Sequence, residues 1–117
     1  MIVVTLFKNE KGFYGFRSQG HAGYDDYGKD IVCAAVSVLT HTVYRSAIVN
    51  CQLKKGDYTE KMIEDDDESL MEFISKVQSD DLDLIMRTLL EGVKSLVESY
   101  GQFVRLEMEL SLLHISE

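Results

Sequence analysis

The order of hydrophobic and polar residues along the chain predicts a hairpin at its start. β-branched and aromatic residues fill 2–8 and 13–19, as is typical of strands. The polar stretch 9–12 between them ends in a glycine, which favours a tight turn, so the two strands are expected to run antiparallel. Gly15 inside the second strand indicates a β-bulge or a close approach of another backbone segment.

Three further strands are expected later in the chain. Residues 58–64 and 69–77 predict two strands joined at the acidic run 64–68. That run lacks the glycine of a calcium-binding loop, so we interpret it as a solvated hairpin tip. Residues 103–112 alternate as expected for a strand with one exposed face. The residues expected to face inward are Val104, Leu106, Met108, Leu110 and Leu112, and those expected to face water are Arg105, Glu107 and Glu109.

Two helices separate these strands. Apolar residues cover most of the circumference of 31–50, which predicts a largely buried helix with Asp30 as its N-cap and Gly28 at the bend before it. Residues 79–81 open a second, amphipathic helix that Gly101 closes. A narrow stripe at helical spacing along the first helix comprises Cys33, Ser37, Thr40, His41 and Tyr44.

The resulting order is strand, strand, helix, strand, strand, helix, strand (ββαββαβ). We predict a single α+β domain over residues 1–117. Its single, mostly antiparallel sheet has about five strands, and both helices pack on one face of it.

Composition and charge narrow the function classes. Twenty acidic against twelve basic residues give a net charge of −8 and no basic stripe, so direct nucleic-acid binding is not expected. An acidic surface is compatible with a basic protein partner. The apolar run at the start of the chain is not preceded by the cationic region typical of a signal peptide, so it is interpreted as a strand. No apolar segment approaches the roughly 20 residues that span a bilayer, so no membrane association is expected.

Cys33 and Cys51 are expected near opposite ends of the first helix. Eighteen residues of helix separate them (51 − 33), a rise of roughly 27 Å. A disulfide needs Cα atoms within about 7 Å of each other, so the two cannot pair within one chain. Two free thiols indicate a reducing compartment, and we expect the cytoplasm.

The stretch from Gly20 to Ser37 carries the candidate chemistry. It joins a loop of three glycines, two tyrosines and two aspartates to the N-terminus of the first helix. The loop has no apolar periodicity and is expected to be surface-exposed and mobile. His21 lies in that loop, and Cys33 is the third residue of the helix. A histidine, a thiol and a helix N-terminus are the parts of a cysteine nucleophile site.

The helix N-terminus is expected to favour the Cys33 thiolate through its unpaired N–H groups and its dipole. The same N–H groups, including that of Cys33, are candidates to hold the oxyanion of a tetrahedral intermediate. His21 is the candidate partner, since His41 lies about 12 Å farther along the helix. Asp30 opposes thiolate formation unless it caps the helix or orients His21, and we favour capping. Ser37 either hydrogen-bonds the site or its own backbone.

A core cysteine is the competing interpretation, because free cysteine is among the most buried residue types. A metal site is disfavoured, since Cys33 and His21 supply only two candidate ligands and no paired-cysteine spacing is present. Cys51 is interpreted as structural. No cofactor is expected.

Gly20-His21-Ala22, then Gly28, then the run 30–35 (DIVCAA) and Ser37 together resemble the signature of the ribosomal-processing cysteine protease (Prp) family. The likeness continues more loosely through LLEGVKSLVESYGQFVRLEMEL and so spans nearly the whole chain. One departure is Tyr100-Gly101, where the family has tyrosine-proline; it affects a turn and not the site.

The resemblance implies an α+β homodimer that removes a short N-terminal extension from large-subunit ribosomal protein twenty-seven. It implies Cys33 as nucleophile and His21 as base, with Asp30 and Ser37 as supporting positions. The loop 22–29 is then a lid that orders over substrate. The substrate-binding and lid residues expected on this basis are Gly20, Ala22, Gly23, Tyr24, Tyr27 and Gly28, of which the two tyrosines are candidate contacts to an aromatic substrate.

Two alternatives stay open at this stage. One is a non-catalytic, ribosome-associated interaction module in which Cys33 belongs only to the core. The other is hydrolysis of a small thioester or amide, which requires only a different pocket.

Overall fold

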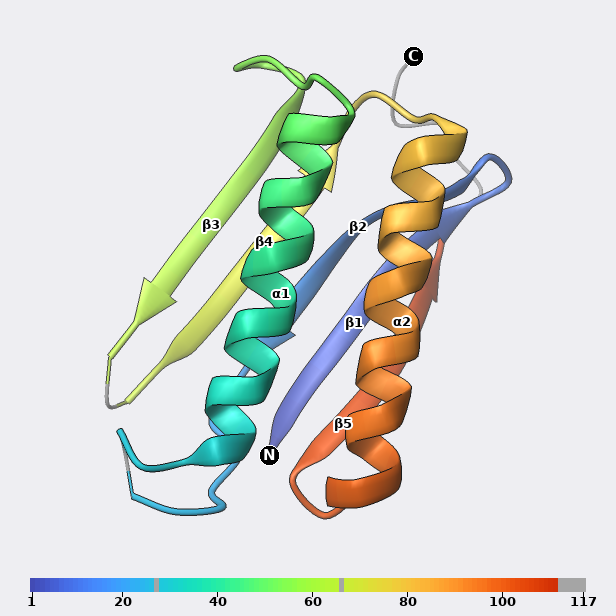
Figure 1. The fold of residues 1–117 in the computed structure, drawn as a ribbon. Coiled ribbons are helices and arrows are strands. Elements are labelled where there is room, and N and C mark those ends of the chain that lie inside the picture. Colours follow the sequence, from blue (N-terminus) through green and yellow to red (C-terminus); the bar gives the residue numbers. More distant parts are fainter. Residues whose placement is uncertain (27, 66, 112–117) are drawn as a thin grey trace.

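The computed structural model describes residues 1–26, 28–65 and 67–111 (Figure 1). The chain follows the predicted order ββαββαβ. Its elements are β1 (Ile2–Asn9), β2 (Gly12–Gln19), α1 (Ile31–Asn50), β3 (Tyr58–Glu64), β4 (Ser69–Ser75), α2 (Asp80–Tyr100) and β5 (Val104–Leu110).

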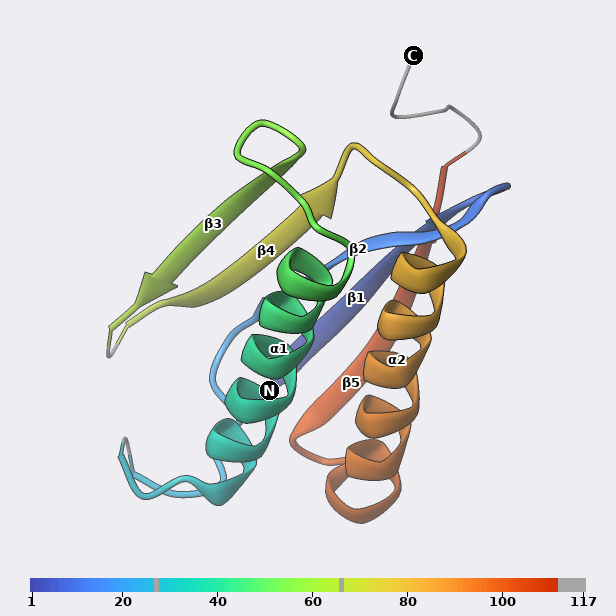
Figure 2. The ribbon, with the colours of Figure 1, turned by 45° about the horizontal axis from the view of Figure 1, so that its top comes forward.

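The five strands form one sheet in the order β3-β4-β2-β1-β5. All neighbouring pairs are antiparallel except β1 and β5, which are parallel. Each helix connects two strands that run in the same direction without being neighbours, α1 joining β2 to β3 and α2 joining β4 to β5. Both helices cover the same face of the sheet (Figures 1 and 2), which confirms the predicted α+β architecture.

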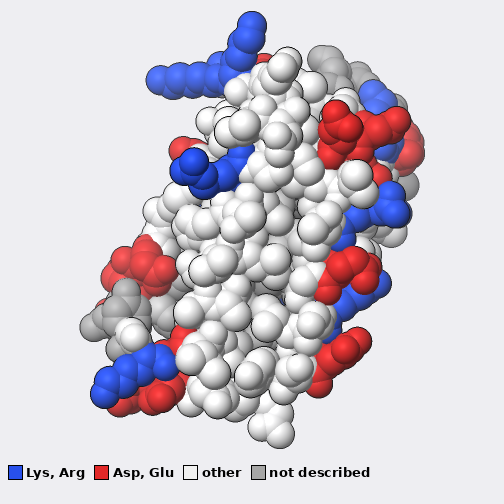
Figure 3. Space-filling view, in the orientation of Figure 1, with Lys and Arg blue, Asp and Glu red and all other residues white. Residues whose placement is uncertain are grey.

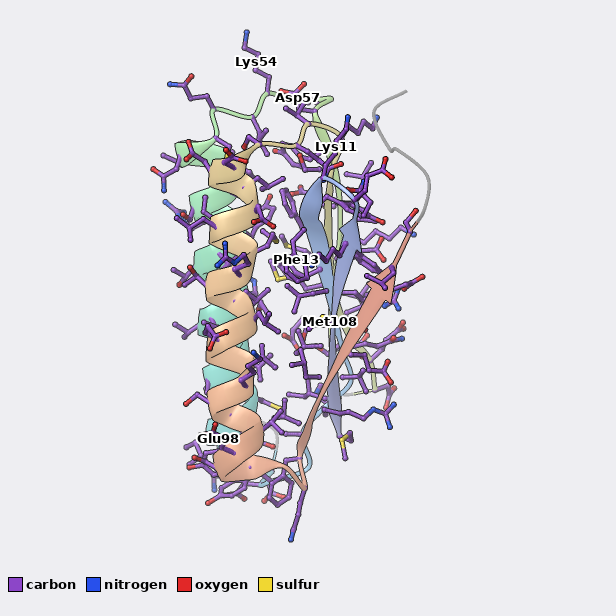
Figure 4. The ribbon with its side chains drawn as sticks, turned by 90° about the vertical axis from the view of Figure 1, so that its right-hand side faces the viewer. Lys11, Phe13, Lys54, Asp57, Glu98 and Met108 are labelled. Atoms are coloured by element: carbon purple, nitrogen blue, oxygen red, sulfur yellow. The ribbon has the colours of Figure 1, made fainter. Side chains whose placement is uncertain are left out.

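The core lies between the two helices and the covered face of the sheet. Figure 4 shows this layer edge-on, with Phe13 directed from the sheet toward α2. Fully burying one large apolar side chain contributes about 1.5–3 kcal/mol, so this layer supplies most of the stabilisation. Its fully buried large side chains include Leu6, Phe16, Phe73, Val32, Leu82, Met86, Leu89 and Val93.

Gly15 has the role that its place in a strand predicts. The register between β1 and β2 shifts after Phe7, where Gly15 pairs with Phe7 and the next pair joins Lys8 to Phe13. A Cβ atom at Gly15 would lie 2.4 Å from the carbonyl oxygen of Phe73 in β4. Both a bulge and a close backbone approach are therefore present at this glycine.

The predicted strand 69–77 ends two residues early, at Ser75. The Ser75 hydroxyl donates to the carbonyl of Val77 and accepts from the Val77 N–H, which turns the chain away from the sheet.

The inward face predicted for the last strand is only partly correct. Val104 is buried and Leu106 is half-buried, but Met108 is half-exposed and Leu110 is 72% exposed. β5 is an edge strand that diverges from α2 toward its C-terminal end (Figure 4), so the helix no longer covers its later residues. Leu112 lies outside the described residues.

The prediction that α1 is largely buried is wrong. One stripe faces the core, formed by Val32, Val36, Thr40, Val43 and Ala47. The opposite side carries apolar residues that face solvent, including Ile31, Val49 and Val38, the last 68% exposed. Apolar periodicity cannot distinguish a helix buried all round from one with an uncovered apolar face. Figure 3 shows the result as a broad uncharged surface, with most charged side chains at its margins.

The expectation that no segment matches a membrane span also needs correction. Within residues 1–26, 28–65 and 67–111, α1 is the one helix with the length and mean hydropathy (20 residues and 1.4) of such a span. Its buried stripe nevertheless packs into the core, as in a core helix that is apolar on both sides.

Candidate active site

A cavity of about 480 Å³ lies between α1, the loop that precedes it and the β3–β4 hairpin. It brings together His21, Asp30, Cys33 and Ser37, as the sequence predicts for one site. Of the expected lid residues, Gly20, Gly23 and Gly28 also line it. Tyr27 lies outside the described residues.

Cys33 is the third residue of α1, and its side chain is half-buried. Its sulfur accepts a hydrogen bond from the backbone N–H of Ala22 over 3.3 Å. The side chain packs against the core on one side and lines the cavity on the other. Cys33 therefore combines core packing with access to the cavity.

Asp30 is the N-cap of α1, as predicted. Its Oδ1 accepts from the N–H groups of Val32 and Cys33, each over 2.9 Å. Its Oδ2 accepts from the N–H groups of Tyr24 and Asp25 over 2.9 and 3.3 Å. One carboxylate thus joins the helix to the loop, and the partners described for it are these backbone N–H groups and the Cys33 side chain, not His21.

Backbone N–H donors explain the ionisation of Asp30. The side chain is only 7% exposed, and burial raises the pKa of its carboxyl. The backbone N–H groups of Cys33, Asp25 and Tyr24 outweigh that effect, so the pKa of Asp30 lies below its ordinary value. The residue is a buried carboxylate at neutral pH.

This arrangement overturns two expectations about the helix N-terminus. The Cys33 N–H is donated to Asp30, so in this conformation it is not available to an oxyanion. The pKa of the Cys33 thiol is raised, first by burial and then by the carboxylates of Asp30 and Glu64. The Ala22 N–H lowers this pKa but does not compensate for the others. The site as described therefore favours a protonated thiol.

His21 follows Gly20, whose φ of +97° and contact with the first residue suit glycine alone. A Cβ at Gly20 would lie 2.5 Å from the carbonyl oxygen of Met1. The Nε2 of His21 lies 3.0 Å from the carbonyl oxygen of Asp65 at the β3–β4 hairpin tip. Because a carbonyl oxygen only accepts, Nε2 carries the proton in this contact. Figures 1 and 2 both show the loop and the hairpin tip on the same side of the start of α1.

The Asp65 contact is a site feature that sequence reasoning missed. The acidic run was correctly predicted as a hairpin tip, where the Asp65 side chain accepts from the N–H groups of Asp67 and Glu68. Its contact with His21 uses a main-chain carbonyl, which every residue type possesses. No residue pattern in the sequence therefore predicts this contact. Asp66 lies outside the described residues.

Ser37 and His41 form a second polar pair along the cavity wall. The Nδ1 of His41 lies 2.8 Å from the Ser37 carbonyl and 3.4 Å from its hydroxyl. The carbonyl requires the proton on Nδ1, which leaves the Nε2 lone pair of a neutral ring for another donor. The described side-chain partner of Ser37 is therefore His41 and not Cys33, and both residues line the cavity.

Two expected substrate-binding residues have other places in the fold. Tyr24 makes edge-to-face contacts with Tyr100 and Phe103, at ring-centroid distances of 5.8 and 5.3 Å. The tyrosine thereby holds the loop against the junction of α2 and β5. Ala22 is 3% exposed and belongs to the core. It contributes its N–H to the site, and its side chain to packing.

The rest of the cavity lining is apolar and acidic. Met62, Ile63, Leu70 and Met71 from the β3–β4 hairpin supply the apolar part. The carboxyl-bearing residues of the lining are Asp25, Asp30 and Glu64, and no lysine or arginine of the described chain is among the lining residues. Such a wall suits an extended peptide with apolar and basic side chains. In the same described residues no three His, Cys, Asp or Glu side chains gather as metal ligands.

Beyond the cavity, α1 is joined to β3 by a hydrogen bond from the Tyr44 hydroxyl to the Glu60 carboxylate. Tyr44 also packs edge-on against Phe73, which Tyr58 contacts from β3. Burial and the Glu60 carboxylate raise the pKa of Tyr44. The Tyr44–Glu60 bond thus connects α1 to the edge strand near the start of β3, whereas the N-terminal end of α1, which carries Cys33, adjoins the cavity and the loop.

Comparison with known proteins identifies the family. The family model for cysteine protease Prp matches residues 1–105. The chain is 33% identical over 110 residues to the ribosomal processing cysteine protease Prp of Staphylococcus aureus strain Mu50, covering 91% of this chain and 97% of that protein. The Prp of S. aureus strain NCTC 8325 matches equally.

Solved structures agree with this match. The crystal structure of SMU.848 from Streptococcus mutans has a TM-score of 0.77 and 26% identity, covering 95% of this chain and 96% of that one. S. aureus Prp in complex with a covalently linked product peptide has a TM-score of 0.74 and 27% identity, covering 93% and 100%. The sequence signature, the fold and the cavity that holds Cys33 all agree: this chain belongs to the Prp family of cysteine proteases.

Proposed function

We propose that this cysteine peptidase removes a short N-terminal extension from large-subunit ribosomal protein twenty-seven, with Cys33 as nucleophile and His21 as base. The observation that carries the proposal is that both residues line one cavity. The S. aureus relatives are named ribosomal processing proteases, and one was solved with a substrate peptide at a TM-score of 0.69, 26% identity and coverage of 93% of this chain. These relatives support a ribosomal protein as the substrate class.

The reaction follows from the chemistry of a thiol and an imidazole. His21 accepts the thiol proton, the Cys33 sulfur bonds to the scissile carbonyl carbon, and the carbonyl π pair moves to oxygen. When the oxyanion collapses, the C–N bond breaks and the His21 imidazolium protonates the leaving amine. A water molecule, deprotonated by His21, then attacks the thioester and returns the sulfur to the thiol. Each proton taken by His21 is given back within the cycle.

The described geometry indicates which interactions of Cys33 and His21 a bound substrate must change. The thiol is stabilised by burial and by nearby carboxylates, and the His21 Nε2 proton is held by Asp65. A basic peptide in the cavity would offset the carboxylates of Asp30 and Glu64 and so favour the thiolate. Of the expected lid 22–29, Ala22 is anchored in the core. The lid role is therefore retained in this proposal for 23–29, with Gly23 and Gly28, both at positive φ, as the points where the loop can reorient.

We further propose that two copies associate through the outer side of α1. This side presents Ile31, Val38 and Val49 to solvent, spaced two and then three helical turns apart, and lies on a surface with few charges (Figure 3). An identical apolar stripe on a second copy would bury all three residues, as an isologous interface requires. The free thiols of Cys33 and Cys51 are compatible with a cytoplasmic enzyme.

The association is tested by sedimentation velocity across a concentration series. Val38→Asp should shift the protein to a monomer, whereas the matched exposed change Leu84→Asp on α2 should leave the dimer intact. A parent protein that sediments as a monomer at all concentrations contradicts this part of the proposal.

The catalytic proposal is tested with extended ribosomal protein twenty-seven as substrate and mass spectrometry of the products. Cys33→Ser and His21→Ala should each abolish processing while the far-UV circular dichroism spectrum stays unchanged. Cys51→Ser is the matched control and should process normally, since its side chain lies at the other end of α1. Normal processing by Cys33→Ser would contradict Cys33 as the nucleophile, whereas a parent protein that does not process the substrate would support the non-catalytic module.

A further inference from the structure

The backbone amides around Cys33 are divided between two acceptors. Val32 and Cys33 donate to Asp30 Oδ1, and Tyr24 and Asp25 donate to Asp30 Oδ2. These four donors, including two from the first turn of α1, therefore serve a carboxylate and not the sulfur. The charge of a Cys33 thiolate must be stabilised by another group.

The Ala22 N–H is directed at the sulfur itself, over 3.3 Å. It comes from outside the helix, from the residue that follows His21. We propose that this N–H is the donor that stabilises the anionic sulfur of Cys33, in place of the helix N-terminus. The inference rests on the assignment of Cys33 as nucleophile under the proposed function, and it adds a main-chain catalytic group to that site.

The Ala22 amide is fixed by the fold on both sides. The Ala22 side chain is 3% exposed within the core, so the residue is anchored there. Two residues earlier, the Gly20 N–H donates to the Ser69 carbonyl of β4 over 2.9 Å. A donor that needs no reorganisation stabilises developing charge most effectively. Substrate-induced movement of the loop beyond Gly23 would leave this donor in place.

The identity of residue 22 supports a main-chain role. Its small buried side chain supplies packing and carries no polar group, so its contribution to the sulfur comes from the N–H alone. The carboxylates that face the sulfur act in the opposite direction, since Asp30 and Glu64 both raise the pKa of the Cys33 thiol. The Ala22 N–H lowers it. The other titratable residues that share the cavity with Cys33 are His21, Asp25 and His41.

The test replaces the amide of Ala22 by an ester, with lactic acid in place of alanine, which keeps the methyl group and removes the N–H. The full chain can be assembled by joining a synthetic segment 1–32 to segment 33–117 at Cys33, since ligation needs a cysteine at the junction. The matched control is an ester at Lys29, whose N–H donates to the Asp26 carbonyl in the same loop.

The readout is the alkylation rate of each cysteine against pH, measured by peptide mass mapping. A hydrogen bond to a charged group predicts that the Ala22 ester raises the apparent pKa of Cys33 by about one unit, or slows its alkylation about tenfold below that pKa. The Lys29 ester should leave the Cys33 profile unchanged. Cys51 reports folding, because its profile should stay constant in both proteins. An unchanged Cys33 profile in a folded Ala22 ester would overturn the inference.

A second measurement needs no ester. In ¹⁵N-labelled protein, the Ala22 amide proton resonance should move downfield with the same midpoint as Cys33 alkylation, and this movement should be lost in Cys33→Ser. An Ala22 resonance that does not titrate with Cys33 would overturn the inference even if the ester protein does not fold. Neither readout uses substrate, so a shifted Cys33 profile without ribosomal-protein processing would contradict only the proposed function.

Discussion

Replacing Asp30 by asparagine should make the protein less stable and its thiol more acidic. Asparagine is as good an N-cap as aspartate, so its carbonyl oxygen can keep the two bonds from Val32 and Cys33. Its amide nitrogen would then face the N–H groups of Tyr24 and Asp25, which now donate to Oδ2. The variant therefore removes the hydrogen bonds to the loop while it keeps those of the helix cap.

The cost follows from the bonds that are lost. A hydrogen bond to a charged group contributes about 1.5–3 kcal/mol. One of the two lost bonds is long at 3.3 Å, and the loop N–H groups can turn toward water, so we expect a loss of about 2 kcal/mol in the free energy of unfolding. For a chain of this length that is a fall in Tm of about 5–10 °C. Asp57→Asn is the matched control, because the Asp57 carboxylate accepts one exposed N–H from Lys54 in a turn.

The thiol should respond in the opposite direction. Burial is the largest cause of the raised pKa of Cys33, but Asp30 adds to it both by its charge and by its hydrogen bond. Asp30→Asn removes that charge, so alkylation of Cys33 should begin at lower pH than in the parent protein. Urea unfolding of the reduced protein and alkylation against pH measure the two effects on the same sample. Unchanged stability, or a Cys33 pKa that rises, would refute the described role of Asp30.

Three further predictions concern the same framework. Folding lowers the pKa of Asp30, so its carboxylate stabilises the protein at pH values above the unfolded pKa of 3.8. This contribution is lost as the pH falls through the lower pKa of the folded state. In acid–urea titrations, the stability difference between the parent protein and Asp30→Asn should therefore shrink below about pH 4. Gly15→Ala should destabilise the protein by about 2 kcal/mol or more, since the new methyl would meet the Phe73 carbonyl, and urea unfolding should show this. Tyr44→Phe should lower the free energy of unfolding by about 1 kcal/mol in the same assay, because it removes the hydrogen bond to Glu60. Because the pKa of Tyr44 is raised, the variant should show the same tyrosinate absorbance as the folded parent protein below pH 11. A lower tyrosinate absorbance in the variant below pH 11 would contradict the hydrogen bond.

Local signals in the sequence are sufficient for most of the fold. The periodicity of the apolar residues predicted the seven elements in order. Asp30 caps the first helix as predicted, and the second helix begins within the predicted 79–81 and ends at Gly101. Gly15 correctly indicated the bulge and the close backbone approach, because only glycine fits at that position. The predictions that were wrong concern burial, which depends on how neighbouring elements pack and not on the periodicity of one element. The exposed side of α1 and the uncovered end of β5, including Leu110, follow from how the two layers are placed, not from either element alone.

The site shows the same division. His21, Asp30 and Cys33, which the sequence assigns to one site, all line one cavity, and Asp30 is the helix cap that was predicted. It did not predict that the cap would occupy the Cys33 N–H, because one carboxylate can accept two helix donors and two loop donors only in the folded chain. The contacts of His21 with Asp65 and of Cys33 with Ala22 both use main-chain groups, which no side-chain pattern reveals.

The most direct measurement is the mass of the protein during turnover. Extended ribosomal protein twenty-seven would be mixed with the protein, the reaction quenched in acid within seconds, and the intact and proteolysed protein analysed by mass spectrometry. If Cys33 is the nucleophile, the parent protein carries a covalent adduct with the mass of the acyl extension, mapped to Cys33 and absent from Cys33→Ser. Cleavage that proceeds without an adduct at Cys33, or with the adduct at Cys51, would contradict the assignment of Cys33 as the nucleophile.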